Sequence, residues 1–240
     1  MRVKKLTTTT NDISPRKIAL IAGLGMLIMT IFAIFPAIYG PTNLIVSEDA
    51  TATANNIIAN GLQFRVGVFS YVVVIILDLV VAWALYVFLK PVNKSLSSLA
   101  ALFRIVYAIL FAASLTNYLN ILQLLSGANY LTVIATNQLH SQVMLSLKAF
   151  SDGWGVAYIF FGLHLALTGY LVFKYRPDSC VTKGLGIVLA ISCSGYLIEY
   201  MGKIVFPNSA QVSMILGWGE LLLLIWLLLK GGSLKSGRKV

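Results

Sequence analysis

The chain is short of charged residues, cysteines and catalytic motifs, and each shortage removes a class of protein. Only 11% of its 240 residues are charged, about half the share found in a soluble domain. Cys180 and Cys193 have no metal-ligand spacing, and thirteen residues of helix would hold them about 20 Å apart, beyond disulfide reach. The sequence has no H-E-x-x-H, no G-x-S-x-G and no glycine-rich phosphate loop, so no familiar motif identifies a catalytic residue.

Apolar residues dominate instead, and they predict a membrane protein. The hydrophobic share is 58% and the mean hydropathy is +0.86, so the surplus apolar surface has to face lipid. A transmembrane helix takes about 20 mainly apolar residues. We therefore predict an all-α, polytopic fold with one domain over residues 18–230, between cytoplasmic tails at residues 1–17 and 231–240. The six predicted spans are residues 18–39, 66–89, 96–125, 154–173, 184–205 and 212–229.

The distribution of basic residues predicts the orientation. In this topology 15 of the 18 Lys and Arg residues lie on one side, and this count includes Lys90, Lys94 and Arg104, which surround the second connection. Cations are retained in the cytoplasm, so both termini are predicted inside, as the even number of spans also requires. The net charge of +10 then reflects topology and contact with anionic lipid headgroups. No aromatic-basic surface accompanies it, so nucleic-acid binding is not expected.

Two outer connections have helical patterns of their own. Acidic and capping residues at 47–49 precede residues 50–60, which we predict to form a short helix. Gly61 would join that helix to the second span. Residues 139–150 carry apolar side chains at helical spacing. They predict either an amphipathic helix on the outer membrane surface or an extension of the fourth span.

Ionisable residues deep in the apolar runs are the candidate functional residues, because each needs a partner, water or a function. Asp78, His164 and Glu220 lie about 12–18 Å from the outer ends of their helices. Polar residues also recur along one face of the third span and one face of the fifth span, toward the outer surface. These depths predict one polar interior region that opens outward. The candidate ligand-binding residues are Asp78, Asn117, Asn120, His164, Glu199 and Glu220.

Each candidate also has a structural interpretation. Asp78 could be neutral, or could hydrogen-bond to Asn117 or to a serine hydroxyl, and His164 could be a satisfied interior histidine. Glu220 could pair with Lys203 or face water, whereas Glu199 and Lys203 have the spacing of a local ion pair. No second histidine lies at a depth suited to a haem. We therefore predict no cofactor and no metal site, and the catalytic residues, if there are any, are unknown.

Several segments together resemble a known family. They are residues 49–57 (DATATANNI), 89–94 (LKPVNK), 99–104 (LAALFR), 161–164 (FGLH) and 169–171 (GYL). The chain is similar over most of its length to the uncharacterised bacterial integral membrane family called domain of unknown function 4386. The resemblance implies a multi-pass protein of the bacterial cytoplasmic (inner) membrane. It implies no activity, cofactor or catalytic residue.

Three functions fit these observations. The first is binding or transport of a small molecule, lipid or proton through an outward-facing polar cavity. The second is an intramembrane enzyme that acts on a lipid, with His164 as base and Asp78 or Glu220 as acid. The third is a non-catalytic protein whose polar groups only fix helix packing. The expected partners are membrane lipids and a small-molecule or lipid ligand, and the sequence does not predict the oligomeric state.

Overall fold

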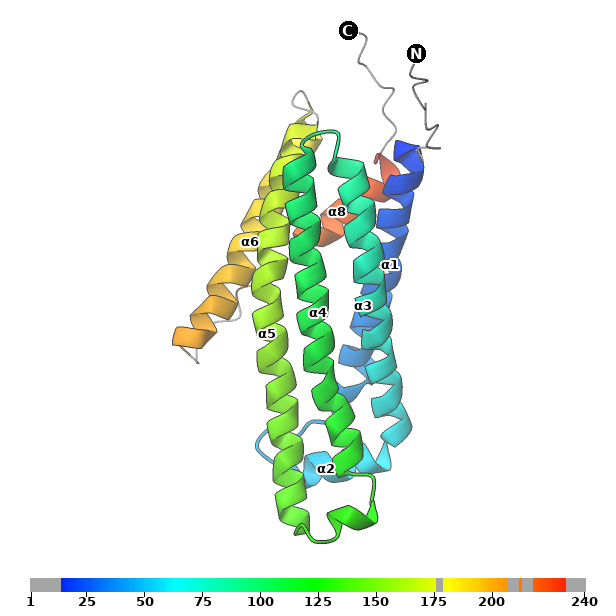
Figure 1. Ribbon diagram of the computed structural model, residues 1–240, viewed down its shortest axis with the longest axis vertical. Coiled ribbons are helices and arrows are strands. Elements are labelled where there is room, and N and C mark those ends of the chain that lie inside the picture. The colour runs from blue at the N-terminus through cyan, green and yellow to red at the C-terminus, as the bar shows by residue number, and fades with distance from the viewer. Residues whose placement is uncertain (1–13, 176–178, 207–211, 213–217, 232–240) are drawn as a thin grey trace, which may run out of the picture.

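The fold is a bundle of long helices that run side by side (Figure 1). The computed structural model describes residues 14–175, 179–206, 212 and 218–231, and these residues contain helices but no strand. Five helices are long and apolar enough to cross a membrane. They are α1 (Pro15–Tyr39), α3 (Gly61–Leu89), α4 (Lys94–Leu124), α5 (Thr136–Tyr175) and α6 (Cys180–Val205). The chain is thus an all-α, polytopic membrane protein, as the sequence predicts.

Shorter helices complete the bundle. The apolar helix α8 (Gly219–Leu229) packs against both α1 and α6, and α2 (Ala50–Ala59) packs mainly against α5. Two 3-10 turns, η1 (Pro41–Leu44) and η2 (Asn129–Leu131), lie in the connections. Figure 1 shows α2 lying across the end of the bundle opposite to the start of α1.

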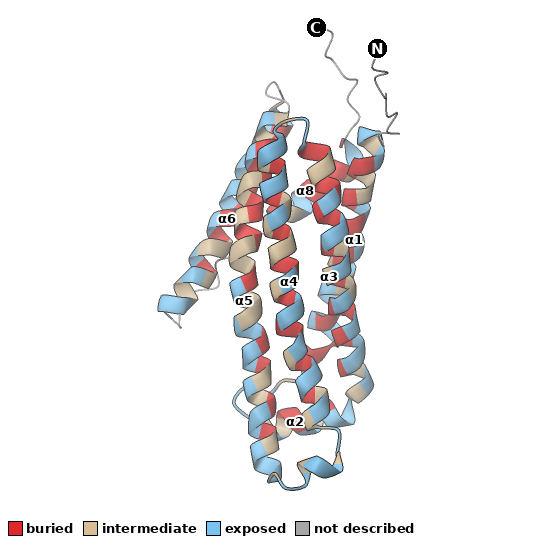
Figure 2. Ribbon diagram, viewed as in Figure 1, coloured by how far each residue is buried: buried red, intermediate tan, exposed pale blue. Residues whose placement is uncertain are grey.

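Neighbouring helices close the bundle into a ring. Contacts join α1 to α3, α3 to α4, α4 to α5, α5 to α6, α6 to α8 and α8 back to α1. The α6 helix leans away from α5 toward its Val205 end (Figure 1). Buried and exposed residues alternate along every long helix (Figure 2), as expected where one helix face packs inside the bundle and another does not. Large apolar side chains such as Ile31, Ile76 and Ile109 are exposed, which suits helix faces in contact with lipid.

Capping residues explain where the helices begin. The Asp49 carboxylate accepts a hydrogen bond of 2.8 Å from the Ala52 amide at the start of α2. The Asn93 side chain accepts one of 3.0 Å from the Leu96 amide at the start of α4. Each bond satisfies an amide that the first turn of a helix leaves without a partner. Pro91 lies between α3 and α4 and has no amide hydrogen to continue a helix.

Three details differ from the sequence prediction or refine it. Residues 139–150 belong to α5, which is one continuous helix of 40 residues, so the extension of the fourth span is the correct alternative. The short outer helix is present as α2. Of the sixth predicted span, residues 212–229, the structure describes a helix only from Gly219, and residues 213–217 lie outside the described part.

Arg16 fastens the end of α8 to the start of α1. Its guanidinium donates hydrogen bonds to the carbonyl oxygens of Leu227 (3.2 Å), Leu228 (2.6 Å) and Gly231 (2.9 Å). Carbonyl groups in the last turn of a helix have no partner within the helix, and a cation there also complements the helix dipole. The start of α1 and the end of α8 therefore lie at the same end of the bundle. We call this the Pro15 end, and the opposite one the Tyr39 end.

Substitution of Arg16 by methionine is expected to loosen α8. The variant loses hydrogen bonds from a charged donor, which contribute roughly 1.5–3 kcal/mol to local stability. The amides of Leu223–Leu229 should then exchange hydrogen for deuterium faster than in the native chain. Lys17→Met is the matched control, because Lys17 is the exposed neighbour. Equal exchange rates in both variants would show that Arg16 does not hold α8.

Candidate functional site

Arg104 occupies the centre of the bundle. It is fully buried, with an exposed fraction of 0%, and it lies ten residues after Lys94, where α4 begins. Ten residues of helix are about 15 Å long, which is too deep for the side chain to reach the membrane surface. Counting Arg104 among the charges of the cytoplasmic side was therefore wrong, because a count of cations near a loop ignores how far each lies inside its helix.

Two carboxylates from other helices pair with Arg104. Its Nη2 atom lies 2.7 Å from the Asp78 Oδ1 atom of α3 and 2.8 Å from the Glu220 Oε1 atom of α8. Asp78 lies eleven residues before the end of α3, so it has almost the same depth as Arg104. The predicted alternatives paired Asp78 with Asn117 and Glu220 with Lys203. In the structure both carboxylates pair with Arg104 instead.

His164 holds the other side of the guanidinium. The Arg104 Nη1 atom lies 3.3 Å from His164 Nε2, and His164 Nδ1 lies 2.9 Å from the Ala100 carbonyl oxygen. A guanidinium only donates and a carbonyl only accepts. The network therefore assigns a neutral imidazole that accepts at Nε2 and donates at Nδ1. Both ring nitrogens are occupied, and the histidine ties α5 to α4.

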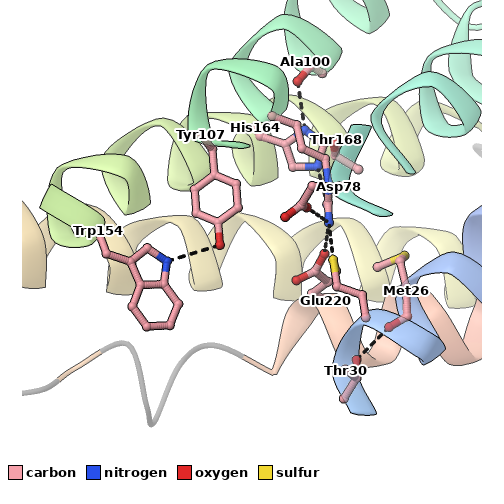
Figure 3. A network of polar contacts seen from close by, with 11 residues as sticks. Met26, Thr30, Asp78, Ala100, Tyr107, Trp154, His164, Thr168 and Glu220 are labelled. Atoms are coloured by element: carbon pink, nitrogen blue, oxygen red, sulfur yellow. Dashed lines mark hydrogen bonds and ion pairs between the residues drawn. The ribbon is translucent and has the colours of Figure 1, made fainter. Parts of the chain in front are cut away.

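Arg104 also contacts apolar groups. The Met29 sulfur atom of α1 lies 3.7 Å from Nη2, and the Phe161 ring of α5 lies beneath the guanidinium with its centroid 5.4 Å from Cζ. The second contact has the geometry of a cation–π interaction. Through these contacts one side chain of α4 touches α1, α3, α5 and α8. Figure 3 shows three of the Arg104 partners, Asp78, His164 and Glu220, joined in one network of polar contacts.

A cavity of about 320 Å³ lies beside this cluster, and all six helices of the ring line it. Asp78, Arg104 and Glu220 form its charged wall. The other walls are largely aromatic, and Figure 3 shows two of the aromatic residues, Tyr107 and Trp154, in one view with Asp78 and Glu220. The aromatic lining residues are Tyr71, Tyr107, Phe111, Trp154, Tyr158, Phe161 and Tyr196.

The cavity extends from the charged cluster toward the Tyr39 end. Its lining runs from Asp78 to Tyr71 in α3 and from Arg104 to Phe111 in α4, which is seven residues in each helix. Seven residues correspond to about 10 Å along a helix. The lining of α1 runs in the same direction, from Met29 to Ala37. The charged wall therefore lies at the inner end of an elongated cavity in one half of the bundle.

Aromatic rings hold one another in the cavity wall. The Phe111 and Trp154 rings are stacked with centroids 4.7 Å apart, and Tyr158 stacks on Tyr196 at 5.2 Å. The Trp154 indole also donates a hydrogen bond of 3.4 Å to the Tyr107 hydroxyl oxygen. That bond leaves the Tyr107 proton to donate elsewhere. The wall is thus an ordered aromatic surface that carries hydroxyl groups.

Polar atoms of the charged wall have capacity for another partner. Within the described residues, both Asp78 oxygens, Glu220 Oε1 and Arg104 Nε are buried without a hydrogen bond of good geometry. Asp78 Oδ1 and Glu220 Oε1 both lie within ion-pair distance of the same Arg104 nitrogen, Nη2. Asp78 Oδ2 is likewise buried without a hydrogen-bond partner among the described residues. Buried polar atoms without partners are costly, so the site is suited to a further polar or charged group.

The predicted site residues thus divide into two sets. Asp78, His164 and Glu220 lie together around Arg104, although His164 does not line the cavity. Asn117 donates a hydrogen bond to the Ser114 carbonyl of its own helix. The structure therefore places Asn117 in a local contact outside the cluster.

Asn120 and Glu199 also lie outside the cluster. Asn120 is exposed and lines a separate hollow with Gln123 and Gln142. The buried Glu199 forms an ion pair of 2.6 Å with Lys203, as its spacing predicts. In the part of the chain that the structure describes, no three His, Cys, Asp or Glu residues are placed to hold a metal ion.

Comparison with known proteins identifies the family. The chain matches the family described as domain of unknown function (DUF4386) over residues 21–231, and it belongs to that family. An uncharacterised protein of Archaeoglobus fulgidus is 37% identical over 174 residues, which cover 71% of this chain and 85% of the relative. No solved structure matches the chain. An archaeal relative at this identity shows that similar chains occur outside bacteria.

Proposed function

We propose that this integral membrane protein binds a small molecule in the intramembrane cavity, as the binding step of a transport activity. The observation that carries the proposal is the cavity itself, which all six helices line and which has a charged wall about 15 Å from the Pro15-end termini of α3 and α4. Its volume of about 320 Å³ falls at the lower end of the range for ligand pockets. Ionisable residues inside a membrane domain commonly mark a substrate or ion pathway.

The other two functions have less support. An enzyme with His164 as base would need a free ring nitrogen facing a substrate, but both nitrogens contact other protein groups. A purely structural cluster would explain the pairing of Arg104 with Asp78 and Glu220. It would not explain why these charged groups face a cavity. We propose further that the chain lies in the cytoplasmic membrane of a prokaryote, since its relative is archaeal.

Filling the cavity tests the proposal. Ala33 lines the cavity from α1, so Ala33→Phe should place a ring in the ligand space. We expect native mass spectrometry to detect a small molecule bound to the native chain and about tenfold less of it on the variant, since a loss of ~1.4 kcal/mol has that effect.

Ala112→Phe is the matched control, because it makes the same substitution at an exposed position of α4. This variant should keep the bound molecule. Equal occupancy of the native chain and Ala33→Phe would contradict binding in this cavity.

A further inference from the structure

The charged wall of the cavity carries an excess of negative charge. With both carboxyl groups ionised, Asp78 and Glu220 contribute two negative charges against the one positive charge of Arg104, and the histidine beside them is neutral. Asp78 is nine-tenths buried or more, at 1% exposed, and its Oδ2 atom has no hydrogen-bond partner among the described residues. An uncompensated charge in a membrane interior costs free energy. One more positive charge in the cavity would therefore stabilise the two carboxylates.

The same arrangement disfavours an anionic ligand. An anion would approach Arg104, but that guanidinium already faces two carboxylates and the His164 nitrogen. The anion would therefore meet like charges at short range, which costs free energy in a poorly screened interior. A cation, in contrast, would meet Asp78 and Glu220 directly.

The aromatic walls favour an organic cation over a bare metal ion. Metal cations such as Ca²⁺ take six to eight oxygen ligands, whereas most of this lining is aromatic or aliphatic. Rings such as Tyr71, Tyr107 and Tyr158 offer apolar contact area and electron-rich faces, which attract ammonium groups. The lining therefore complements a ligand that has both a positive charge and an apolar body.

We propose that the ligand is a monovalent organic cation, a lipophilic amine or quaternary ammonium compound. Its charge lies against Asp78 and Glu220, and its apolar body extends along the aromatic wall toward the Tyr39 end. This inference rests on the proposed binding function and names the chemical class of its ligand. A proton on one carboxyl group would neutralise the same charge, and binding measurements separate that case from ours.

Three probes of similar shape and different charge test the proposal. They are phenyltrimethylammonium, its neutral analogue tert-butylbenzene and the anion benzenesulfonate. Isothermal titration of the purified full-length chain in detergent gives each affinity, and parallel titration of Ala33→Phe corrects for partition into micelles. We expect phenyltrimethylammonium to bind at least about tenfold more tightly than either other probe.

Charge variants then test where the cation lies. Glu220→Gln removes one negative charge, so its affinity for phenyltrimethylammonium should fall at least about tenfold, while any affinity for tert-butylbenzene is unchanged. Asp78→Asn should have the same effect. Glu199→Gln is the matched control, because Glu199 is also buried and paired with a cation but does not line the cavity. It should leave all three affinities unchanged.

Each opposite result overturns the organic-cation assignment. If tert-butylbenzene or benzenesulfonate binds the native chain as tightly as the cation, the cavity binds ligands but is not selective for positive charge. If every probe has the same affinity for the native chain and for Ala33→Phe, a proton on one carboxyl group, and not an organic cation, compensates the excess negative charge. The mass-spectrometric comparison of Ala33→Phe with Ala112→Phe then decides separately whether the cavity holds a molecule.

Discussion

Replacing Arg104 with methionine is expected to destabilise the bundle by about 3–5 kcal/mol, the range for breaking one side of a buried ion pair. The substitution leaves two carboxylates facing each other without their shared cation. It also removes the donor to His164 Nε2. Since Arg104 touches side chains of α1, α3, α5 and α8, the loss should lower the cooperative unfolding midpoint of the whole domain. Thermal or denaturant unfolding in detergent, followed by tryptophan fluorescence, measures the effect.

Two further variants separate electrostatics from packing. Adding Asp78→Asn and Glu220→Gln to Arg104→Met removes all three charges, and this triple variant should recover most of the lost stability, because a neutral cluster has no charge to compensate. Lys148→Met breaks an exposed pair with Asp152 and should change stability by less than about 1 kcal/mol. If Arg104→Met unfolds at the native midpoint, the ion pairs do not hold the bundle together.

Length and hydropathy predicted most of the architecture. Five of the six predicted spans correspond to described helices that are long and apolar enough to cross a membrane. The apolar pattern could not show whether residues 139–150 lie on the membrane or continue into α5, because both arrangements bury one face of the same helix. The orientation with both termini inside stays a prediction, although the start of α1 and the end of α8 lie at one end of the bundle.

The site was predicted only in part, and Arg104 shows why. Depth along a helix can be counted from sequence, and the same count that selected Asp78 would have placed Arg104 about 15 Å inside α4. Partner identity depends instead on how each helix is rotated about its axis, and spacing within one helix does not determine that. Asn117 and Asn120 illustrate the limit, since their three-residue interval drifts around α4. One bonds within its helix, and the other is exposed.

A second large effect is expected where α5 crosses α6. A Cβ atom on Gly169 would lie 2.8 Å from the Gly186 carbonyl oxygen and 3.0 Å from Leu189 Cβ, and one on Gly186 would lie 2.7 Å from the Gly169 carbonyl oxygen. The two backbones are thus in direct contact, as small residues allow in membrane helices. Gly169→Leu should destabilise the protein by about 1–3 kcal/mol or more, because overpacking must move a backbone rather than a flexible side chain.

Gly184→Leu is the control for this prediction. Gly184 belongs to α6 as well, but a Cβ atom there meets nothing within 4 Å. The control should therefore leave the unfolding midpoint close to that of the native chain, or raise it slightly, because leucine favours a helix more than glycine does. Equal midpoints for Gly169→Leu and Gly184→Leu would contradict close backbone packing at this crossing.

Displacement of α6 should also disturb the charged wall of the cavity. The Ser192 hydroxyl of α6 accepts a hydrogen bond of 3.0 Å from the Gly219 amide, at the residue before Glu220. Moving α6 away from α5 would thus draw the start of α8, and Glu220 with it, away from Arg104. In a Cys180→Ser background, the buried Cys193 of Gly169→Leu should react faster with N-ethylmaleimide than Cys193 of the native chain does. Gly169→Leu should also bind phenyltrimethylammonium more weakly than the native chain. Faster labelling with unchanged cation affinity would show that α6 does not position Glu220.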